Sequence, residues 1–175
     1  MAFTCIGLAL PGVLRIRPQR FDDARGFFAE TFQEEAFAGF GVSDRFVQDN
    51  LSFSKQGVLR GLHFQRPPHA QAKLVRCLSG EIFDVAADFD PASPTYGQHV
   101  SARLSGETNE MLYVPARYAH GFCVLSESAF VEYKVSAFYH PECAGGVRYS
   151  DPVFSIPWPV LAPILSEQDQ SWPAL

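Results

Sequence analysis

Residues 46–65 concentrate side chains that could do chemistry. The segment reads FVQDNLSFSKQGVLRGLHFQ and places Arg60 and His63 three residues apart. Short apolar runs broken by turn residues predict two strands here, at residues 50–54 and 58–64, joined by a turn. An imidazole on such a strand could transfer protons near neutral pH. It could also be a core histidine whose ring nitrogens are satisfied by hydrogen bonds.

Arg60 and His63 would point to opposite faces of a regular strand, because successive side chains alternate. Gly61 lies between them and could host a β-bulge that turns both toward one side. A guanidinium group fits the paired oxygens of a phosphate. The sequence therefore leaves open whether an anion clamp and a base share one site.

Three further side chains could serve the same site, and each has a structural alternative. Lys73 opens an apolar run, where its ammonium could stabilise negative charge or simply extend to the solvent at a barrel rim. Tyr133 shares the apolar face of residues 129–138, so its hydroxyl could transfer a proton or make one buried hydrogen bond. Asp169 follows Ser166 at capping-box spacing, and could instead orient an imidazole.

Metal binding is not expected from these spacings. An H-x-H pair would place two imidazoles on one strand face, but that position reads His63-Phe64-Gln65, which is a poor transition-metal site. His120 lies in a loop that enters a strand, which suits a position at a barrel mouth. The cysteines form no C-x-x-C motif and are scattered: Cys5, Cys77, Cys123 and Cys143.

Composition predicts one globular domain over residues 1–175. The chain is 47% hydrophobic and contains 16 Phe, enough for a substantial core. Its net charge of −5 without a basic block argues against nucleic-acid binding, which needs clustered Lys and Arg. No apolar stretch reaches membrane-spanning length, and isolated cysteines are typical of the reducing cytoplasm.

Element patterns predict a mainly β fold, a sandwich or barrel of many short strands. Residues 33–40 predict the one clear helix, with acidic residues at its start and Gly41 after it. Ser79-Gly80 predicts a hairpin between the strands on either side. The proline-rich residues 151–164, within a C-terminal segment 151–175, should lie extended across the body. The other expected strands fall at residues 6–16 (two strands around Pro11-Gly12), 73–78, 81–89, 98–104, 110–114, 121–125 and 129–138.

Several motifs together resemble the dTDP-4-dehydrorhamnose 3,5-epimerase family. They occur in one order along the chain: RGFF (25–28), FVQDN (46–50), VLRGLHFQ (58–65), KLVRC (73–77), GEIFDV (80–85), Pro115 with AHGF (119–122), YK (133–134), and a tail from DP (151–152) through WP (158–159) and LS (165–166) to Asp169. The resemblance implies a cupin-like antiparallel jelly-roll β-barrel with a few short helices. It also implies that no metal or cofactor is needed, and a homodimer in which some residues reach into the neighbouring site.

The resemblance also implies residue roles. His63 would be the base, oriented by Asp169, while Lys73 would stabilise an enolate and Tyr133 would deliver a proton from the opposite face. The positions that would hold the nucleotide sugar are Arg25, Glu30, Gln48, Asn50, Arg60, His120 and Tyr139.

The implied reaction converts dTDP-4-dehydro-6-deoxy-D-glucose into dTDP-4-dehydro-L-rhamnose, for dTDP-L-rhamnose biosynthesis in the cytoplasm. One C4 ketone acidifies the protons on both C3 and C5, so removal on one face and return on the other inverts each carbon. Two alternatives stay open: a relative that inverts only C3 or only C5, and a cupin that binds a nucleotide sugar without catalysis.

Overall fold

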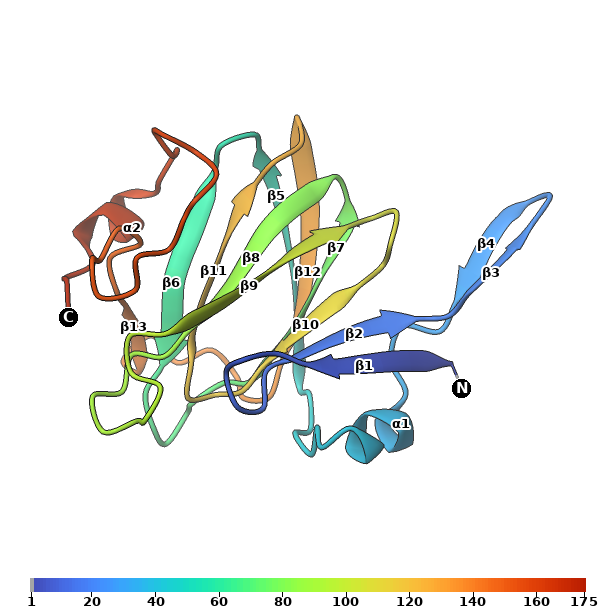
Figure 1. The fold of residues 1–175 in the computed structure, drawn as a ribbon, viewed down its shortest axis with the longest axis horizontal. Helices are drawn as coiled ribbons and strands as arrows, with labels where there is room; N and C mark the ends of the chain where they lie inside the picture. The colour runs from blue at the N-terminus through green and yellow to red at the C-terminus, as the bar shows by residue number, and fades with distance from the viewer. Residues whose placement is uncertain (1) are drawn as a thin grey trace.

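Two antiparallel sheets packed against each other form the body of the computed structural model, which describes residues 2–175 (Figure 1). One sheet has the strand order β1-β2-β10-β7-β12-β5, and the other has the order β13-β6-β11-β8-β9. This confirms the mainly β jelly-roll expectation, with only two short helices among the described residues. The strands are β1 (Phe3–Gly7), β2 (Leu14–Pro18), β3 (Arg20–Asp23), β4 (Gly26–Ala29), β5 (Gln48–Lys55), β6 (Leu59–Gln65), β7 (Lys73–Ser79), β8 (Glu81–Ala87), β9 (His99–Ser105), β10 (Met111–Val114), β11 (Ala119–Val124), β12 (Ser128–Val135) and β13 (Ala144–Gly146), and the helices are α1 (Glu34–Gly39) and α2 (Glu167–Ser171).

Alternating strand residues fill the space between the two sheets. Val75 and Val131 from the first sheet pack with Ile82, Ala86 and Phe122 from the second. Tyr133 contacts this cluster while remaining partly exposed. The period-two pattern thus separates an inner face, which carries the core and the cavity, from an outer face on each sheet.

A different segment packs on the outer face of each sheet. Helix α1 packs Phe37 against Leu74 and Met111 of the first sheet, which confirms the helix predicted at residues 33–40. Residues 151–164 run without a helix or strand over the second sheet, as expected, and bury Phe154 against Leu62. Neither helix is long and apolar enough to cross a membrane.

The hairpin predicted at Ser79-Gly80 is wrong. Strand β7 pairs with β10 and β12, whereas β8 pairs with β11 and β9 in the other sheet. Because both edges of β7 are occupied, β8 cannot pair with it, and the chain crosses between the sheets. Strands β5 and β6 likewise enter different sheets, so the two strands expected within residues 46–65 face each other across the barrel. Local turn patterns carry no information about these long-range pairings.

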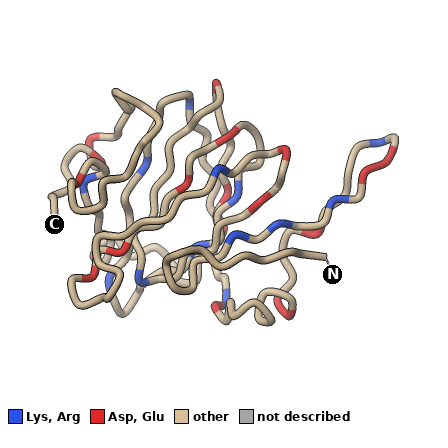
Figure 2. Tube along the Cα trace, in the orientation of Figure 1, with Lys and Arg blue, Asp and Glu red and all other residues tan. Residues whose placement is uncertain are grey.

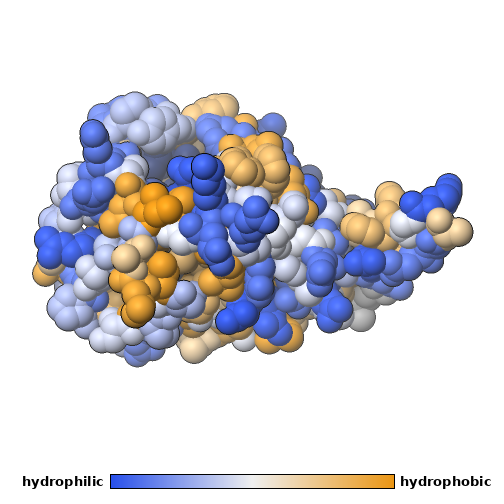
Figure 3. All heavy atoms as spheres, turned by 90° about the horizontal axis from the view of Figure 1, so that it is seen from above, coloured by the Kyte–Doolittle hydropathy of each residue, from blue (hydrophilic) through white to orange (hydrophobic). Residues whose placement is uncertain are grey.

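Strands β3 and β4 form a hairpin that projects away from the sandwich, and this projection was not predicted (Figure 1). It exposes Phe21, Phe27 and Phe28 to at least half of their full extent. Figure 3 shows the projection from above, with hydrophobic residues among hydrophilic ones. Acidic and basic residues are interspersed along the whole trace, including the hairpin (Figure 2).

The crossing at Gly80 gives a stability prediction. Its φ is +84°, and a Cβ there would lie 2.1 Å from the Ser128 carbonyl oxygen. We expect Gly80→Ala to lower the free energy of unfolding by at least about 2 kcal/mol, measured by urea denaturation. Gly7→Ala, in a strand with nothing within 4 Å of the added methyl, is the matched control. Equal midpoints for the two variants would contradict this account of the crossing.

Candidate active site

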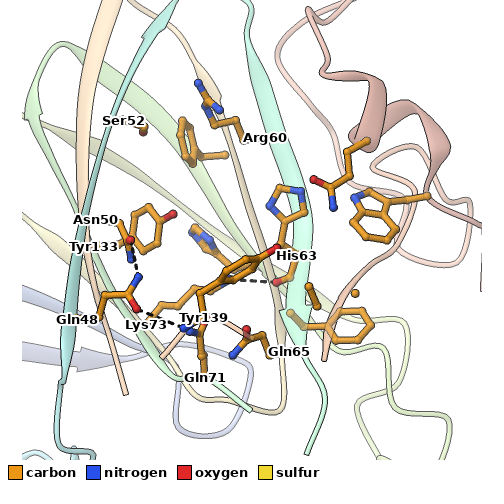
Figure 4. Close-up of a pocket in the computed structure, with 17 residues that line it drawn as sticks. Gln48, Asn50, Ser52, Arg60, His63, Gln65, Gln71, Lys73, Tyr133 and Tyr139 are labelled. Atoms are coloured by element: carbon orange, nitrogen blue, oxygen red, sulfur yellow. Dashed lines mark hydrogen bonds between the residues drawn. The ribbon is translucent and has the colours of Figure 1, made fainter. Parts of the chain in front are cut away.

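A cavity of about 370 Å³ opens between the sheets, lined by residues of both (Figure 4). Most of the predicted site residues lie around it: Gln48, Asn50, Arg60, His63, Lys73, His120, Tyr133 and Tyr139. Sequence reasoning did not identify several other lining residues: Ser52, Gln71, Gln168 and Trp172. These have ordinary polar or aromatic side chains that no local pattern distinguishes.

His63 and Asp169 form a hydrogen-bonded pair at the cavity wall. His63 Nε2 lies 2.5 Å from Oδ1 of Asp169, which is only 4% exposed. Burial works to raise the pKa of the Asp169 carboxyl, but its contacts with His63 and Ser166 outweigh burial and hold the pKa below its usual range. An ionised Asp169 therefore accepts the hydrogen of Nε2, which leaves Nδ1 of His63 free to exchange a proton.

Asp169 combines the two roles that its sequence position left open. Ser166 caps α2 by accepting a hydrogen bond from the Asp169 backbone N–H at 3.1 Å. The Ser166 hydroxyl in turn donates to Asp169 Oδ2 at 2.8 Å. One carboxylate oxygen is thus engaged by the cap, and the other is held toward His63.

A β-bulge in β6 turns Arg60 and His63 to the same cavity. His120 pairs with His63 and Phe122 with Arg60, so two residues of β6 lie opposite one of β11. Gly61 has φ of +130°, and a Cβ there would lie 2.5 Å from the Gly121 Cα. The close contact admits only glycine at this position.

A buried network of three ionisable groups lies at the cavity floor. Lys73, which is 7% exposed, donates to the His63 carbonyl oxygen at 3.1 Å. His120 Nε2 lies 2.7 Å from Oδ1 of the fully buried Asp84. Burial lowers the pKa of Lys73 to about 8, although Asp84 acts to raise it. Burial also lowers the pKa of His120, again opposed by Asp84.

Asp84 is a site residue that the sequence analysis missed. By strand alternation it shares a face of β8 with Ile82 and Ala86, and that face is the interior. A carboxylate on an inward apolar face was the available signal, because a buried charge needs a partner. Its Oδ2 has no hydrogen-bond partner among the described residues, which leaves its negative charge available to Lys73.

Tyr133 and His63 face the cavity from opposite sheets (Figure 4). Burial raises the pKa of the Tyr133 phenol, with the charge of Arg60 opposing, so the hydroxyl keeps its proton at neutral pH. Near Tyr133, Gln48 donates to Asn50 Oδ1 at 2.8 Å. The cavity therefore offers a proton acceptor on one wall and a proton donor on the other.

Arg25 and Glu30 do not lie in this cavity. Arg25 is at the turn of the β3–β4 hairpin, where its side chain is 89% exposed and pairs with Asp23. Glu30 follows directly after β4. Within one chain, Arg25 and Glu30 therefore lie outside the cavity that the other predicted binding residues line.

The arrangement belongs to the cupin-like class of antiparallel jelly-roll barrels. The family model for dTDP-4-dehydrorhamnose 3,5-epimerase matches residues 7–175. The dTDP-4-dehydrorhamnose 3,5-epimerase of Shigella flexneri is 48% identical over 161 residues, which cover 91% of this chain and 89% of that protein. The chain belongs to the dTDP-4-dehydrorhamnose 3,5-epimerase family.

Two solved structures of relatives extend the likeness to three dimensions. The enzyme from Bacillus anthracis, with TDP and PPi bound, has a TM-score of 0.96 at 40% identity and covers 99% of this chain and 100% of its own. The enzyme from Legionella pneumophila, in complex with dTDP-4-keto-L-rhamnose, has a TM-score of 0.94 at 43% identity, with coverages of 98% and 92%.

The electrostatic effect of Asp84 on Lys73 gives a titration prediction. Asp84→Asn removes the negative charge that raises the pKa of Lys73 while burial remains, so we expect that pKa to fall below about 8. NMR of the lysine side chain, followed against pH, would measure it. Asp88→Asn is the control, because Asp88 is equally buried but bonds to Ser93 and Thr95 instead. A Lys73 pKa in Asp84→Asn that is equal to or above the wild-type value would contradict the proposed coupling.

Proposed function

We propose that this protein is an isomerase that inverts C3 and C5 of dTDP-4-dehydro-6-deoxy-D-glucose, giving dTDP-4-dehydro-L-rhamnose for dTDP-L-rhamnose biosynthesis. The observation that carries this proposal is that His63 and Tyr133 reach one cavity from opposite sheets. Inversion needs a proton removed on one face of a carbon and returned on the other, which requires two separate carriers. Membership of the epimerase family supports the same reaction.

His63 would remove the proton next to the ketone. Its Nδ1 is free for this step because Asp169 holds Nε2. The buried carboxylate would stabilise the imidazolium that forms, as it does in other His–Asp pairs. Tyr133 would then return a proton from the opposite wall, and burial keeps its phenol protonated until that step.

Lys73 would stabilise the enolate that forms when the proton leaves. With a pKa of about 8, it is mostly protonated at pH 7, and its buried ammonium can bind the C4 oxygen in a weakly screened environment. His120 with Asp84 completes this floor. Proton removal and return change no oxidation state, so the proposed reaction uses no redox cofactor, and Lys73 takes the role a metal would otherwise have.

The rest of the cavity would hold the nucleotide. Arg60 suits the pyrophosphate, since its guanidinium can bind two oxygens at once. Tyr139 is 57% exposed and its backbone N–H donates to Gln48 Oε1, which places an aromatic ring at the rim. Gln48 and Asn50 present amides beside it.

We further propose a cytoplasmic homodimer in which one chain completes its neighbour's site. Arg25 lies in the β3–β4 hairpin, and Glu30 follows it directly. This hairpin projects from its own chain and carries exposed phenylalanines (Figure 3). Such a projection would reach a neighbouring cavity and bury its apolar rings there. The four cysteines are all free thiols, in keeping with a reducing compartment, and residues 1–175 would act as one domain.

Solvent deuterium exchange tests the two-carrier mechanism. Wild type should incorporate deuterium at both C3 and C5, and His63→Ala should lose both because the base is gone. Tyr133→Phe should keep exchange by His63 but form inverted product at least about 100-fold more slowly. Mass spectrometry and NMR of the recovered nucleotide sugar would measure both. Absence of exchange in wild type would refute the function, and exchange at one carbon only would favour the single-carbon alternative.

Complementation tests the shared site. Arg25→Ala and His63→Ala should each be nearly inactive alone, because each removes one component of both sites. In a 1:1 mixture, half of the dimers are mixed and each has one complete site, so activity should recover to about a quarter of wild type.

The matched control mixes Lys73→Met with His63→Ala, two changes within the same cavity. Each mixed dimer then has one defect per cavity, and no activity should return. Recovery in this control, or none in the Arg25 mixture, would contradict the proposed exchange of residues between chains.

A further inference from the structure

A second cluster of reactive side chains lies beside the cavity. His69, Glu142 and Cys143 each bring one possible metal-ligand atom within 4.8 Å of the others. His69 lies in the loop between β6 and β7, and the other two lie in the turn before β13. Among residues 2–175, no other group of three or more His, Cys, Asp and Glu side chains comes together in this way. The proposed reaction uses none of the three.

The fold itself joins the two loops. The Gln65 side chain donates to the His69 carbonyl oxygen at 2.6 Å and accepts from the His140 N–H at 2.7 Å. The Arg66 N–H donates to the Cys143 carbonyl oxygen at 2.8 Å. These bonds use backbone atoms of His69 and Cys143 and leave the side chains of both residues free. Binding would therefore cost little additional ordering.

His140 supports two of the three side chains from behind. Its ring stacks on that of His69, with centroids 3.4 Å apart and planes 14° apart. Its Nδ1 lies 3.0 Å from Glu142 Oε1, so the carboxylate has its second oxygen available. Partners of this kind, placed behind metal ligands, fix the orientation of those ligands and strengthen binding.

We propose that His69, Glu142 and Cys143 form a binding site for one Zn²⁺ ion. Imidazole, thiolate and carboxylate are ligands that zinc accepts together, whereas Ca²⁺ and Mg²⁺ prefer sites made of oxygen alone. Water would take the fourth position. On binding, the Cys143 thiol gives its proton to solvent and its sulfur lone pair to the ion.

The geometry needs only a small contraction. In a tetrahedral site with Zn–N of about 2.0 Å and Zn–S of about 2.3 Å, neighbouring ligand atoms lie about 3.3–3.8 Å apart. The three atoms lie within 4.8 Å, and the exposed Glu142 can rotate to close the difference. The prediction of no metal rested on the family resemblance and on the spacing of residues along the sequence. That spacing carries no information about a site assembled from two distant loops.

The ion would act as a clamp at the cavity rim. Tyr139, which lines the cavity, precedes Glu142 by three residues, and Lys73 follows His69 by four. An ion that joins the two loops would restrict the segments that lead to Tyr139 and to Lys73. It would not contact the reacting atoms. The clamp is independent of the proposed reaction, so either can fail without the other.

Titration of tag-free full-length protein with Co²⁺ and then Zn²⁺ tests the site. Co²⁺ should produce a thiolate charge-transfer band at one ion per chain, which Zn²⁺ abolishes. Cys143→Ser should lose the band and bind Zn²⁺ at least about 100-fold more weakly, and His140→Asn should bind about 10–100-fold more weakly. Cys5→Ser changes another half-buried thiol and should leave both properties unchanged.

Three results would overturn the proposal: an unchanged Zn²⁺ affinity in Cys143→Ser, loss of the band in Cys5→Ser, or binding that does not saturate at one ion per chain. Misfolding is separable, because the bonds from Gln65 and Arg66 use only backbone atoms of the ligand residues. His69→Gln therefore keeps them and provides a second variant. It should bind Zn²⁺ at least about 100-fold more weakly while unfolding at the wild-type urea concentration.

Discussion

The close approach of β6 and β11 at Gly61 and Gly121 is the constraint on which the cavity depends. A Cβ on Gly61 would overlap the Gly121 backbone, so the two strands can meet here only through glycine. In a regular strand, Arg60 would share the outward face of Leu62, which packs beneath the tail. The extra residue of the bulge turns Arg60 inward, so that Arg60 and His63 face one cavity from a single strand.

The second determinant is the charge enclosed between the sheets. An isolated ammonium or carboxylate buried this deeply would be strongly destabilising, and opposite charges offset much of that cost. Asp84 lies next to both groups: its charge offsets the burial of the Lys73 ammonium, and its Oδ1 is hydrogen-bonded to His120, whose pKa burial lowers. Lys73 is thereby kept ionisable near neutral pH while remaining poorly hydrated. An ammonium in that condition binds a developing enolate oxygen more strongly than one in water would.

The sequence predicted those features that depend on local pattern. Alternation identified most strands and placed Tyr133 beside the core, and the acidic first turn with Gly41 after the last turn identified α1. Strand pairing depends on contacts between distant residues, which is why the hairpin at Ser79-Gly80 was wrong. The partnership of Asp84 with His120 was missed for the same reason, because it joins residues of two different strands. The β3–β4 hairpin pairs neighbouring residues, but no local pattern shows that it projects from the sheets. Motif resemblance named residues of the candidate cavity but could not show which of them one chain brings together.

Asp169 illustrates how a local rule and a distant contact combine in one side chain. Helix α2 has five residues, too few to be stable by itself, so the capping box with Ser166 cannot hold the carboxylate in place alone. The docked tail is also needed: it packs through Phe154 on the second sheet and through Trp172, whose ring lies 6.2 Å from that of His63. This packing holds the second carboxylate oxygen at the imidazole. The orientation of the proposed base is therefore a consequence of tertiary packing more than a hundred residues along the chain, and any change that loosens the tail should loosen the base with it.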